Sequence, residues 1–323
     1  MLRDFTAHPE IREQSVREPI FVAGYLRTGS TKLVRMLAAS GDFNDLPLWK
    51  ALNPSSITGI PGEDPGARIA DAEQFLHDLY TGSPGAAAIH EQGALLTEEE
   101  SYIFVQDLRC AGYLSYANVP SYLQWLAGQD LQGTYEYLLD VLKYLQWQGL
   151  ADPGRRWLLK SPFHLGQEAL LARTFPDATL LFTHRPPAQF LSSMCSLMAG
   201  YMKWHTDYTH VDGPSIVGGF AFNMDRHFAF REAPSLPYLD LDYRDVTGNS
   251  AKIIPEVYRK IGAPLTETAL GAMQQWERAN PIHKHGGHRY APEEFGMSEA
   301  FIDEQCRRYD DFYRATFGEA VRS

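Results

Sequence analysis

A short glycine-bracketed loop at residues 24–31, with the sequence GYLRTGST, carries the residue types most suited to chemistry. Its glycine spacing matches the phosphate loop G-x-x-x-x-G-K-[ST], in which backbone N–H groups and a helix N-terminus bind phosphate oxygens. Ser30 stands where that loop has lysine, and Arg27 lies inside the loop. A buried arginine is unfavourable unless it meets an anion. We therefore expect an anion site here, the alternative being a tight structural turn.

A second anion site is predicted where another apolar run ends. Arg185 follows the run at residues 178–183, and Ser193 comes eight residues later. A strand-end arginine and a hydroxyl two helical turns further on can bind one anion if the helix folds back beside the strand. Alternatively, Arg185 pairs with a surface carboxylate and Ser193 is solvated.

A third group of side chains follows the apolar run at residues 157–160. Lys160 ends this run, and His164 comes four residues later. Ligands of open α/β sheets bind at the carboxyl ends of the strands, so both residues are expected at the site. The alternatives are a surface lysine and an ordinary histidine at a helix N-terminus.

The elements that position these residues form an α/β pattern. Four apolar runs, at residues 19–24, 157–160, 178–183 and 236–241, each lie close to a helical segment, which predicts a central parallel sheet with helices on both faces. Leu33, Val34, Met36 and Leu37 recur at helical spacing after the loop, and Gly41 is expected to end that helix. Further helices are predicted at residues 253–261, 267–279 and about 298–317.

A helical insertion is predicted at about residues 65–149. The segment lacks alternating polarity and contains amphipathic stretches at residues 97–108 and 134–145. A chain of 323 residues accommodates such an insertion within one α/β domain, so we expect a single domain over residues 1–323.

Composition narrows the possible partners. A formal net charge of −11 argues against broad binding to nucleic acid, polyanions or anionic lipid, which leaves a small or neutral partner. Three widely separated cysteines lack the spacing of a zinc site or a disulfide framework. No segment approaches the roughly 20 apolar residues of a membrane span. These features favour a cytoplasmic protein with no membrane partner.

The three motifs together resemble those of the sulfotransferases. The loop at residues 24–31 is similar to the family forms P-K-S-G-T-T and P-R-T-G-T-T, with Leu26 in place of proline. Stretches 156–165 and 183–193 are similar to the family's catalytic strand and second anion site. The resemblance extends to residues 243–245, 288–290 and 295–296, and it covers most of residues 19–317. It is strongest toward a bacterial group with the P-R-T-G-T-T loop.

The resemblance implies sulfuryl transfer from 3′-phosphoadenosine 5′-phosphosulfate (PAPS) to a hydroxyl or amine of a small-molecule acceptor, without a metal and with adenosine 3′,5′-bisphosphate (PAP) as product. The implied donor-binding residues are Arg27, Thr28, Gly29, Ser30, Thr31, Arg185 and Ser193. Arg27 and Lys160 would stabilise the transferring group, and His164 would take the acceptor proton. Lys32, after the motif, is a possible additional cation near the donor.

Other proton acceptors remain open at this point. Histidine suits the step because its reference pKa near 6.5 leaves it largely neutral at neutral pH. His90 and the acidic run Glu98, Glu99 and Glu100 are rivals, since a desolvated carboxylate can also act as a base. A solvated first helical turn is the usual interpretation of such a run.

Two other classes of function share the loop. A nucleotide kinase or triphosphatase would need the lysine that Ser30 replaces. A nucleotide-binding protein without activity would not need Arg27, Lys160, Arg185 and Ser193 together. For the acceptor, two aromatic groups are candidate pocket linings or core: Tyr201, Met202, Trp204, His205 and Tyr208, and Tyr113, Tyr116, Tyr122 and Trp125.

Overall fold

The protein is represented by a computed structural model that describes residues 1–82, 90–208, 210–281 and 291–319. Its centre is one sheet of four strands, β1 (Ile20–Gly24), β2 (Leu158–Ser161), β3 (Thr179–His184) and β4 (Tyr238–Asp242). The strand order is β2-β1-β3-β4, and every pairing is parallel. The four predicted strands and their parallel arrangement are confirmed.

Strand order explains where a ligand can bind. β1 is central, with β2 on one side and β3 on the other, so the chain crosses from one side of β1 to the other between β2 and β3. Such a switch point leaves a crevice outside the carboxyl ends of the strands. The register places Gly24 beside Thr183 and Ala23 beside Ser161, so these strands end at one common edge.

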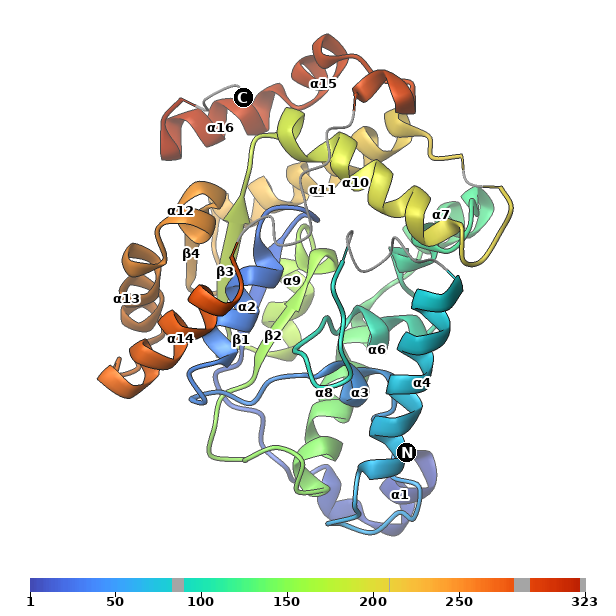
Figure 1. Cartoon of the computed structure of the whole chain (residues 1–323), viewed down its shortest axis with the longest axis vertical. Helices are drawn as coiled ribbons and strands as arrows, with labels where there is room; N and C mark the ends of the chain where they lie inside the picture. The colour runs from blue at the N-terminus through green and yellow to red at the C-terminus, as the bar shows by residue number, and fades with distance from the viewer. Residues whose placement is uncertain (83–89, 209, 282–290, 320–323) are drawn as a thin grey trace.

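Helices cover both faces of the sheet (Figure 1). The helices of the described residues are α1 (Leu2–Ala7), α2 (Ser30–Ala38), α3 (Leu48–Leu52), α4 (Gly66–Gly82), α6 (Ser101–Gln106), α7 (Pro120–Ala127), α8 (Gln132–Trp147), α9 (Glu168–Thr174), α10 (Pro187–Met202), α11 (Gly213–Glu232), α12 (Tyr243–Gly248), α13 (Ser250–Ile261), α14 (Glu267–Ala279), α15 (Glu299–Gln305) and α16 (Arg307–Phe317). Short 3₁₀ turns are η1 (Pro9–Ile11), η2 (Ala111–Ser115), η3 (Pro162–His164) and η4 (Pro292–Phe295).

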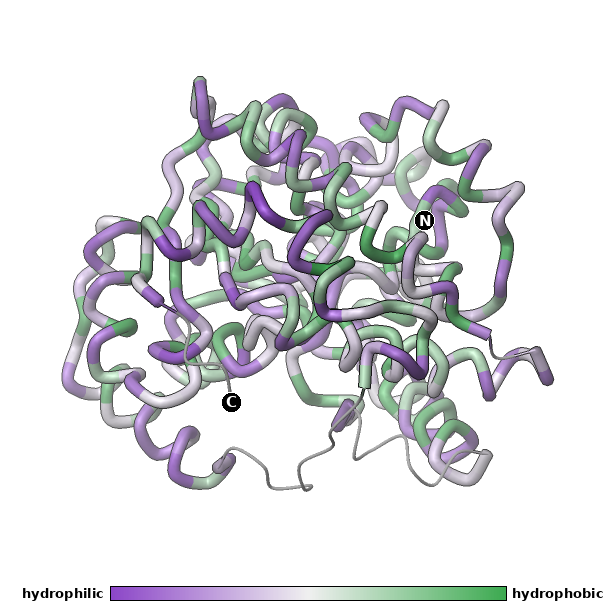
Figure 2. Tube along the Cα trace, turned by 90° about the horizontal axis from the view of Figure 1, so that it is seen from above, coloured by the Kyte–Doolittle hydropathy of each residue, from purple (hydrophilic) through white to green (hydrophobic). Residues whose placement is uncertain are grey.

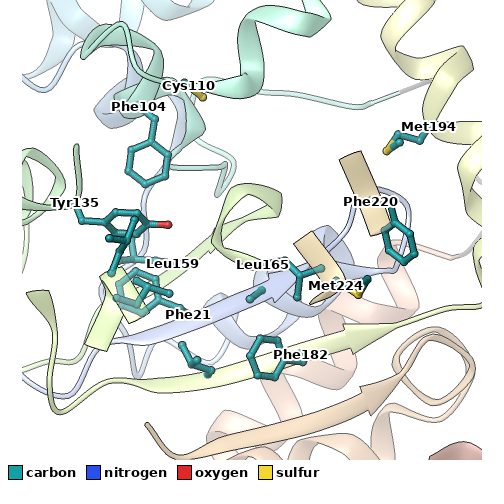
Figure 3. Close-up of a cluster of buried hydrophobic side chains, with 14 of the residues drawn as sticks. Phe21, Phe104, Cys110, Tyr135, Leu159, Leu165, Phe182, Met194, Phe220 and Met224 are labelled. Atoms are coloured by element: carbon teal, nitrogen blue, oxygen red, sulfur yellow. The ribbon is translucent and has the colours of Figure 1, made fainter. Parts of the chain in front are cut away.

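Alternate residues of the buried strands belong to two separate cores. Phe21, Leu159 and Phe182 pack with α8, α9, α10 and α11 on one face, as Figure 3 shows for part of that cluster. Val22 and Leu181 pack with α2, α13 and α14 on the other face. Strands buried on both faces need continuous apolar runs, which is why the runs were visible in the sequence. Hydrophilic and hydrophobic residues are interspersed along the Cα trace (Figure 2).

The segment predicted as a helical insertion contains α4, α6, η2, α7 and α8. Helix α8 nearly coincides with the predicted stretch 134–145, whereas the stretch 97–108 forms only the short helix α6. The predicted last helix is divided into α15 and α16, because Cys306 has φ −101° and ψ 9° and leaves the helical geometry. Helix α11, which is 20 residues long, was not predicted.

Candidate active site

The phosphate-type loop connects β1 to α2 through two left-handed residues. Arg27 has φ 71° and Gly29 has φ 88°, and Gly29 is the N-cap of α2. A left-handed arginine is unusual and marks a constrained loop. Thr28 holds the loop in place: its hydroxyl donates to the Tyr25 carbonyl at 2.7 Å and lies 2.7 Å from the Thr183 hydroxyl on β3.

Gly24 is required by the same close contact. A Cβ at this position would overlap the hydroxyl of Thr183 and would lie 2.9 Å from the Thr183 carbonyl oxygen. The loop therefore approaches β3 more closely than any larger residue permits.

Ser30 and Thr31 occupy the first turn of α2, where backbone N–H groups lack intrahelical partners. Both residues line the cavity described below. Lys32 does not: its ammonium group donates to Glu277 at 2.6 Å and to the Thr247 carbonyl at 2.8 Å. Lys32 thus ties α2 to α14 and α12 through these two contacts.

Arg27, Arg185 and Ser193 come together although they are far apart in the sequence. Arg27 Nε donates to the Ser193 hydroxyl at 3.2 Å, and Arg185 Nη1 donates to the Arg27 carbonyl at 3.0 Å. The convergence arises because α10 starts directly after β3 and carries Ser193 back over the loop. The two predicted anion sites therefore adjoin each other.

The guanidinium of Arg185 is only partly satisfied by its protein contacts. Its guanidinium lies 4.2 Å from the ring centroid of Tyr243, and its buried Nε has no hydrogen-bond partner within the described part of the chain. Burial lowers the pKa of Arg185, and the positive charge of Arg27 adds to that effect. A negatively charged ligand would relieve both costs.

A cavity of about 110 Å³, which we call the reaction cavity, opens beside the loop. Its charged lining residues come from the loop, from β2 and from the segment before α6. The lining is Leu26, Arg27, Ser30, Thr31, His90, Glu98, Glu99, Ser101, Tyr102, Val105, Gly112, Ser115, Tyr116, Lys160, Pro162, Phe163, Leu197 and Tyr201.

Lys160 and Glu99 form the central ion pair of this cavity. The Lys160 side chain is 3% exposed and the Glu99 side chain 13%, and their charged groups are in direct contact. Glu99 also accepts a hydrogen bond of 2.9 Å from Ser101. Lys160 lies at the site as predicted, whereas the acidic run was expected to be a solvated first helical turn. That interpretation is wrong, because Glu98 and Glu100 are buried.

Glu98 forms the wall of the reaction cavity together with Arg35 and His90. Arg35 Nη2 lies 2.5 Å from one carboxylate oxygen, and His90 Nε2 lies 3.1 and 3.2 Å from the two oxygens. Burial opposes ionisation of Glu98, but the nearby His90 and Arg35 outweigh it and lower its pKa to about 2. Glu98 is therefore a fixed negative charge.

This ion pair should make stability pH-dependent. The folded-state pKa of Glu98 lies below the unfolded value of about 4.3, so its stabilisation, on the order of 3 kcal/mol, is present above that pH and is lost as the pH falls toward 2. We expect the gap in urea midpoint between wild type and Glu98→Gln to shrink from pH 7 to pH 3.5. Glu73→Gln, on the exposed face of α4, is the control. Parallel pH profiles of wild type and Glu98→Gln would contradict this assignment.

His164 is placed differently from what its predicted role needs. It is 0% exposed and does not line the reaction cavity. Both ring nitrogens are occupied: Nε2 contacts Glu100, and Nδ1 lies 3.1 Å from the Tyr135 hydroxyl. Glu100 in turn accepts a 2.7 Å hydrogen bond from the backbone N–H of Lys160. His164 thus braces the strand that carries Lys160.

The predicted aromatic linings are mostly elsewhere. Tyr201 and Tyr116 line the reaction cavity, whereas Met202 belongs to the core and Tyr208 is 57% exposed. The resemblance at residues 288–290, and the histidine-rich stretch that contains it, lie outside the described residues. Within the described residues no three His, Cys, Asp or Glu side chains are grouped as a metal site, and no helix there is long and apolar enough to cross a bilayer.

Comparison with known proteins shows which family this chain is similar to. Residues 19–267 match the model of the sulfotransferase family. The crystal structure of the sulfotransferase STF1 from Mycobacterium tuberculosis H37Rv has 28% identity and a TM-score of 0.76, covering 94% of this chain and 80% of that one. No match is found among curated proteins.

A second solved structure, the sulfotransferase STF9 from Mycobacterium avium, has a TM-score of 0.83 and covers 100% of this chain and 82% of that one. At 22% identity this likeness shows the shared fold alone. The family match spans more than half of the chain and includes the loop, Lys160, Arg185 and Ser193. The chain therefore belongs to the sulfotransferase family and is a transferase.

Proposed function

We propose that the enzyme transfers a sulfuryl group from PAPS to a hydroxyl or amine of a small-molecule acceptor. The observation that carries the donor assignment is Arg185. Its buried Nε, which has no hydrogen-bond partner among the residues that the structure describes, lies beside a left-handed glycine loop and a helix N-terminus. This arrangement suits a ligand with two separate anionic groups, which PAPS has and a simple phosphate lacks.

The donor-binding residues divide into two groups, one for each anionic group of PAPS, and Arg27 lies between them. Backbone N–H groups of Gly29, Ser30 and Thr31, with the Arg27 guanidinium, would hold the 5′-phosphosulfate. Arg185 and the Ser193 hydroxyl would hold the 3′-phosphate. Thr28 would act indirectly, because its buried hydroxyl is used to fix the loop on Thr183.

The chemistry would be an in-line displacement. PAPS supplies the sulfuryl group and a 5′-phosphate leaving group, and PAP is the product. As the acceptor oxygen or nitrogen bonds to sulfur, the bond between sulfur and the bridging oxygen breaks, so negative charge builds on that oxygen. Lys160 and Arg27 would stabilise this charge, and a fixed cation in a site shielded from water is effective for that purpose.

For the acceptor proton we propose Glu99 rather than His164. Glu99 lines the reaction cavity and contacts Lys160, whereas His164 is fully buried between Glu100 and Tyr135. Of the other carboxylates in the run, Glu98 already has both oxygens in contact with Arg35 or His90, and Glu100 is 0% exposed. A base must come within hydrogen-bond reach of the proton that it takes, which favours Glu99.

Two further expectations stay proposals. We propose a single domain over residues 1–323, supported by one apolar cluster that joins Phe21 of the sheet to Phe104 and Leu138 of the insertion. We also propose a cytoplasmic location. The three cysteines, Cys110, Cys195 and Cys306, are all free and buried, as expected in a reducing compartment.

Ligand-induced stabilisation tests the donor assignment. PAP is expected to raise the melting temperature more than ATP at equal concentration, because Arg185 and Ser193 would reward a 3′-phosphate that ATP lacks. At about 100 times its dissociation constant, a ligand adds about 2.7 kcal/mol of stability. Arg185→Ala should weaken PAP binding by roughly ten- to a hundredfold, the loss of one charge-assisted hydrogen bond.

Arg308→Ala is the matched control, since Arg308 is 57% exposed and pairs with Asp225 on the surface. Equal shifts of the melting temperature by PAP and ATP would contradict the proposed 3′-phosphate site. Transfer itself is tested by incubating labelled PAPS with a panel of hydroxylated and amine acceptors and detecting sulfated products by mass. PAP binding without any sulfated product would favour an inert nucleotide-binding protein.

A further inference from the structure

A larger second cavity, which we call the apolar cavity, has a volume of about 430 Å³ and adjoins the reaction cavity. Four residues, Leu26, Ser115, Pro162 and Phe163, line both cavities. Its other walls come from α6, η2, α7, α8, α9, α10 and α11. The apolar cavity lies in the size range of small-molecule sites, whereas the reaction cavity has room for only a few water-sized groups.

Hydrocarbon dominates the walls of the apolar cavity. Phe104, Leu165 and Met194 are among its lining residues, as are Cys110 and Tyr135, and Figure 3 labels all five within the buried hydrophobic cluster. Further apolar walls are Leu114, Leu123, Leu126, Leu131, Leu170, Met198 and Ile216.

Most polar side chains of the lining already have protein partners. The Tyr135 hydroxyl is bonded to His164 at 3.1 Å, and the Thr134 hydroxyl donates to Asp107 at 2.5 Å. Gln167 accepts from Arg226 at 3.0 Å, and Ser215 donates to Asp212 at 2.6 Å. A ligand in this cavity therefore meets mainly apolar surface.

The apolar cavity has a solvent end and a reactive end. Phe222 on α11 is 59% exposed, and Arg109 and Arg226 are exposed lining residues, so they mark the mouth. Pro162 and Phe163 follow β2 directly and carry the lining to the neighbourhood of Lys160. A molecule that enters at the mouth can thus present one end to the ion pair of Lys160 and Glu99.

We infer that the acceptor is an elongated apolar alcohol, with its hydrocarbon body in the apolar cavity and its hydroxyl in the reaction cavity. This inference rests on the proposed function. The acceptor oxygen would bond to sulfur, the bond from sulfur to the 5′-phosphate oxygen would break, and the hydroxyl proton would pass to Glu99. Each methylene buried in the cavity should improve binding about fourfold, which corresponds to about 0.8 kcal/mol.

Two adjacent glycines of α11 provide a matched pair of variants. Gly218 and Gly219 both have open space where a Cβ would lie, but only Gly219 lines the apolar cavity. Gly219→Leu should partly fill the cavity, whereas Gly218→Leu makes the same chemical change on the same helix outside it. Leucine also has a better helix propensity than glycine, so neither variant is expected to unfold α11.

The test uses straight-chain alkanols from 1-butanol to 1-decanol. Titration calorimetry with PAP present should give dissociation constants that fall about fourfold per methylene until the cavity is filled. With PAPS, kcat/KM for formation of the alkyl sulfate should rise in parallel. Gly219→Leu should reduce the preference for 1-decanol over 1-butanol by about 10- to 100-fold in both measurements, and Gly218→Leu should keep the wild-type preference.

The calorimetric measurement tests the acceptor inference even if no turnover is detected. Equal affinity for 1-butanol and 1-decanol, or an equal effect of the two glycine variants, would overturn the apolar acceptor. If sugars or polar amines are sulfated while alkanol length has no effect, the acceptor inference fails and the sulfotransferase proposal stands. If alkanols bind as expected but PAP gives no stabilisation, the donor assignment fails instead.

Discussion

Replacing Glu99 with glutamine is expected to lower turnover at saturating donor by about 10²- to 10⁴-fold, the usual contribution of a general base. Glutamine keeps the shape of the side chain and can still accept the 2.9 Å hydrogen bond from Ser101, but it cannot take the acceptor proton. Affinity for PAP should change little, because the proposed donor contacts are made by the loop, Arg185 and Ser193. Single-turnover kinetics and PAP titration measure the two effects separately.

His164→Gln is the informative comparison. Its side chain is 0% exposed and contacts Glu100, so its loss should appear first as a lower melting temperature and only indirectly in turnover. If Glu99→Gln retains near-normal turnover and His164→Gln loses more than a hundredfold with a normal melting temperature, the roles proposed for these two residues are reversed.

The parts of the site that were predictable from the sequence are those set by neighbouring residues. β1, the loop and α2 are consecutive, so an apolar run, two glycines and a helical repeat predict their order. Lys160 and Arg185 directly end or follow buried strands, and parallel strands end at one edge. These relations need no knowledge of distant contacts.

The partner of Lys160 was not predictable in this way. Glu99 is 61 residues away, and it reaches Lys160 only because the insertion folds back over the strand ends. The one sequence signal was a glutamate run directly before an apolar helical stretch. Such a run is normally solvated, and nothing local distinguishes a buried carboxylate from an exposed one.

Helix α11 illustrates how tertiary packing overrides local preference. Gly218 and Gly219 lower helix propensity by about 1 kcal/mol each relative to alanine, which hid the helix in the sequence. Phe220, Met224 and Phe228 pack into the large core cluster and compensate for that loss. Because α11 forms one wall of the apolar cavity, the proposed acceptor site could not be predicted from the sequence either.

Lys160→Met is expected to lower turnover by about 10²- to 10³-fold, the range measured when one donor to a developing negative charge is removed. Methionine has similar length and suits a side chain that is 3% exposed, so the strand should persist. Lys203→Met, at the exposed end of α10, is the matched control and should keep wild-type turnover. Turnover of Lys160→Met within threefold of wild type would show that Arg27 alone stabilises the leaving group.

The ion pair of Lys160 and Glu99 should make the effects of Lys160→Met and Glu99→Gln depend on each other. Lys160→Met leaves the Glu99 carboxylate without its cation, so part of its loss comes from an unpaired charge rather than from the missing contact to the leaving group. Combining it with Glu99→Gln removes that charge. We therefore expect the turnover of the double variant to be at most about tenfold lower than that of the less active single variant. If the two losses were independent, they would multiply and turnover would be far lower. Losses that multiply would mean that the two residues act independently, and the proposed coupling of base and cation would then be wrong.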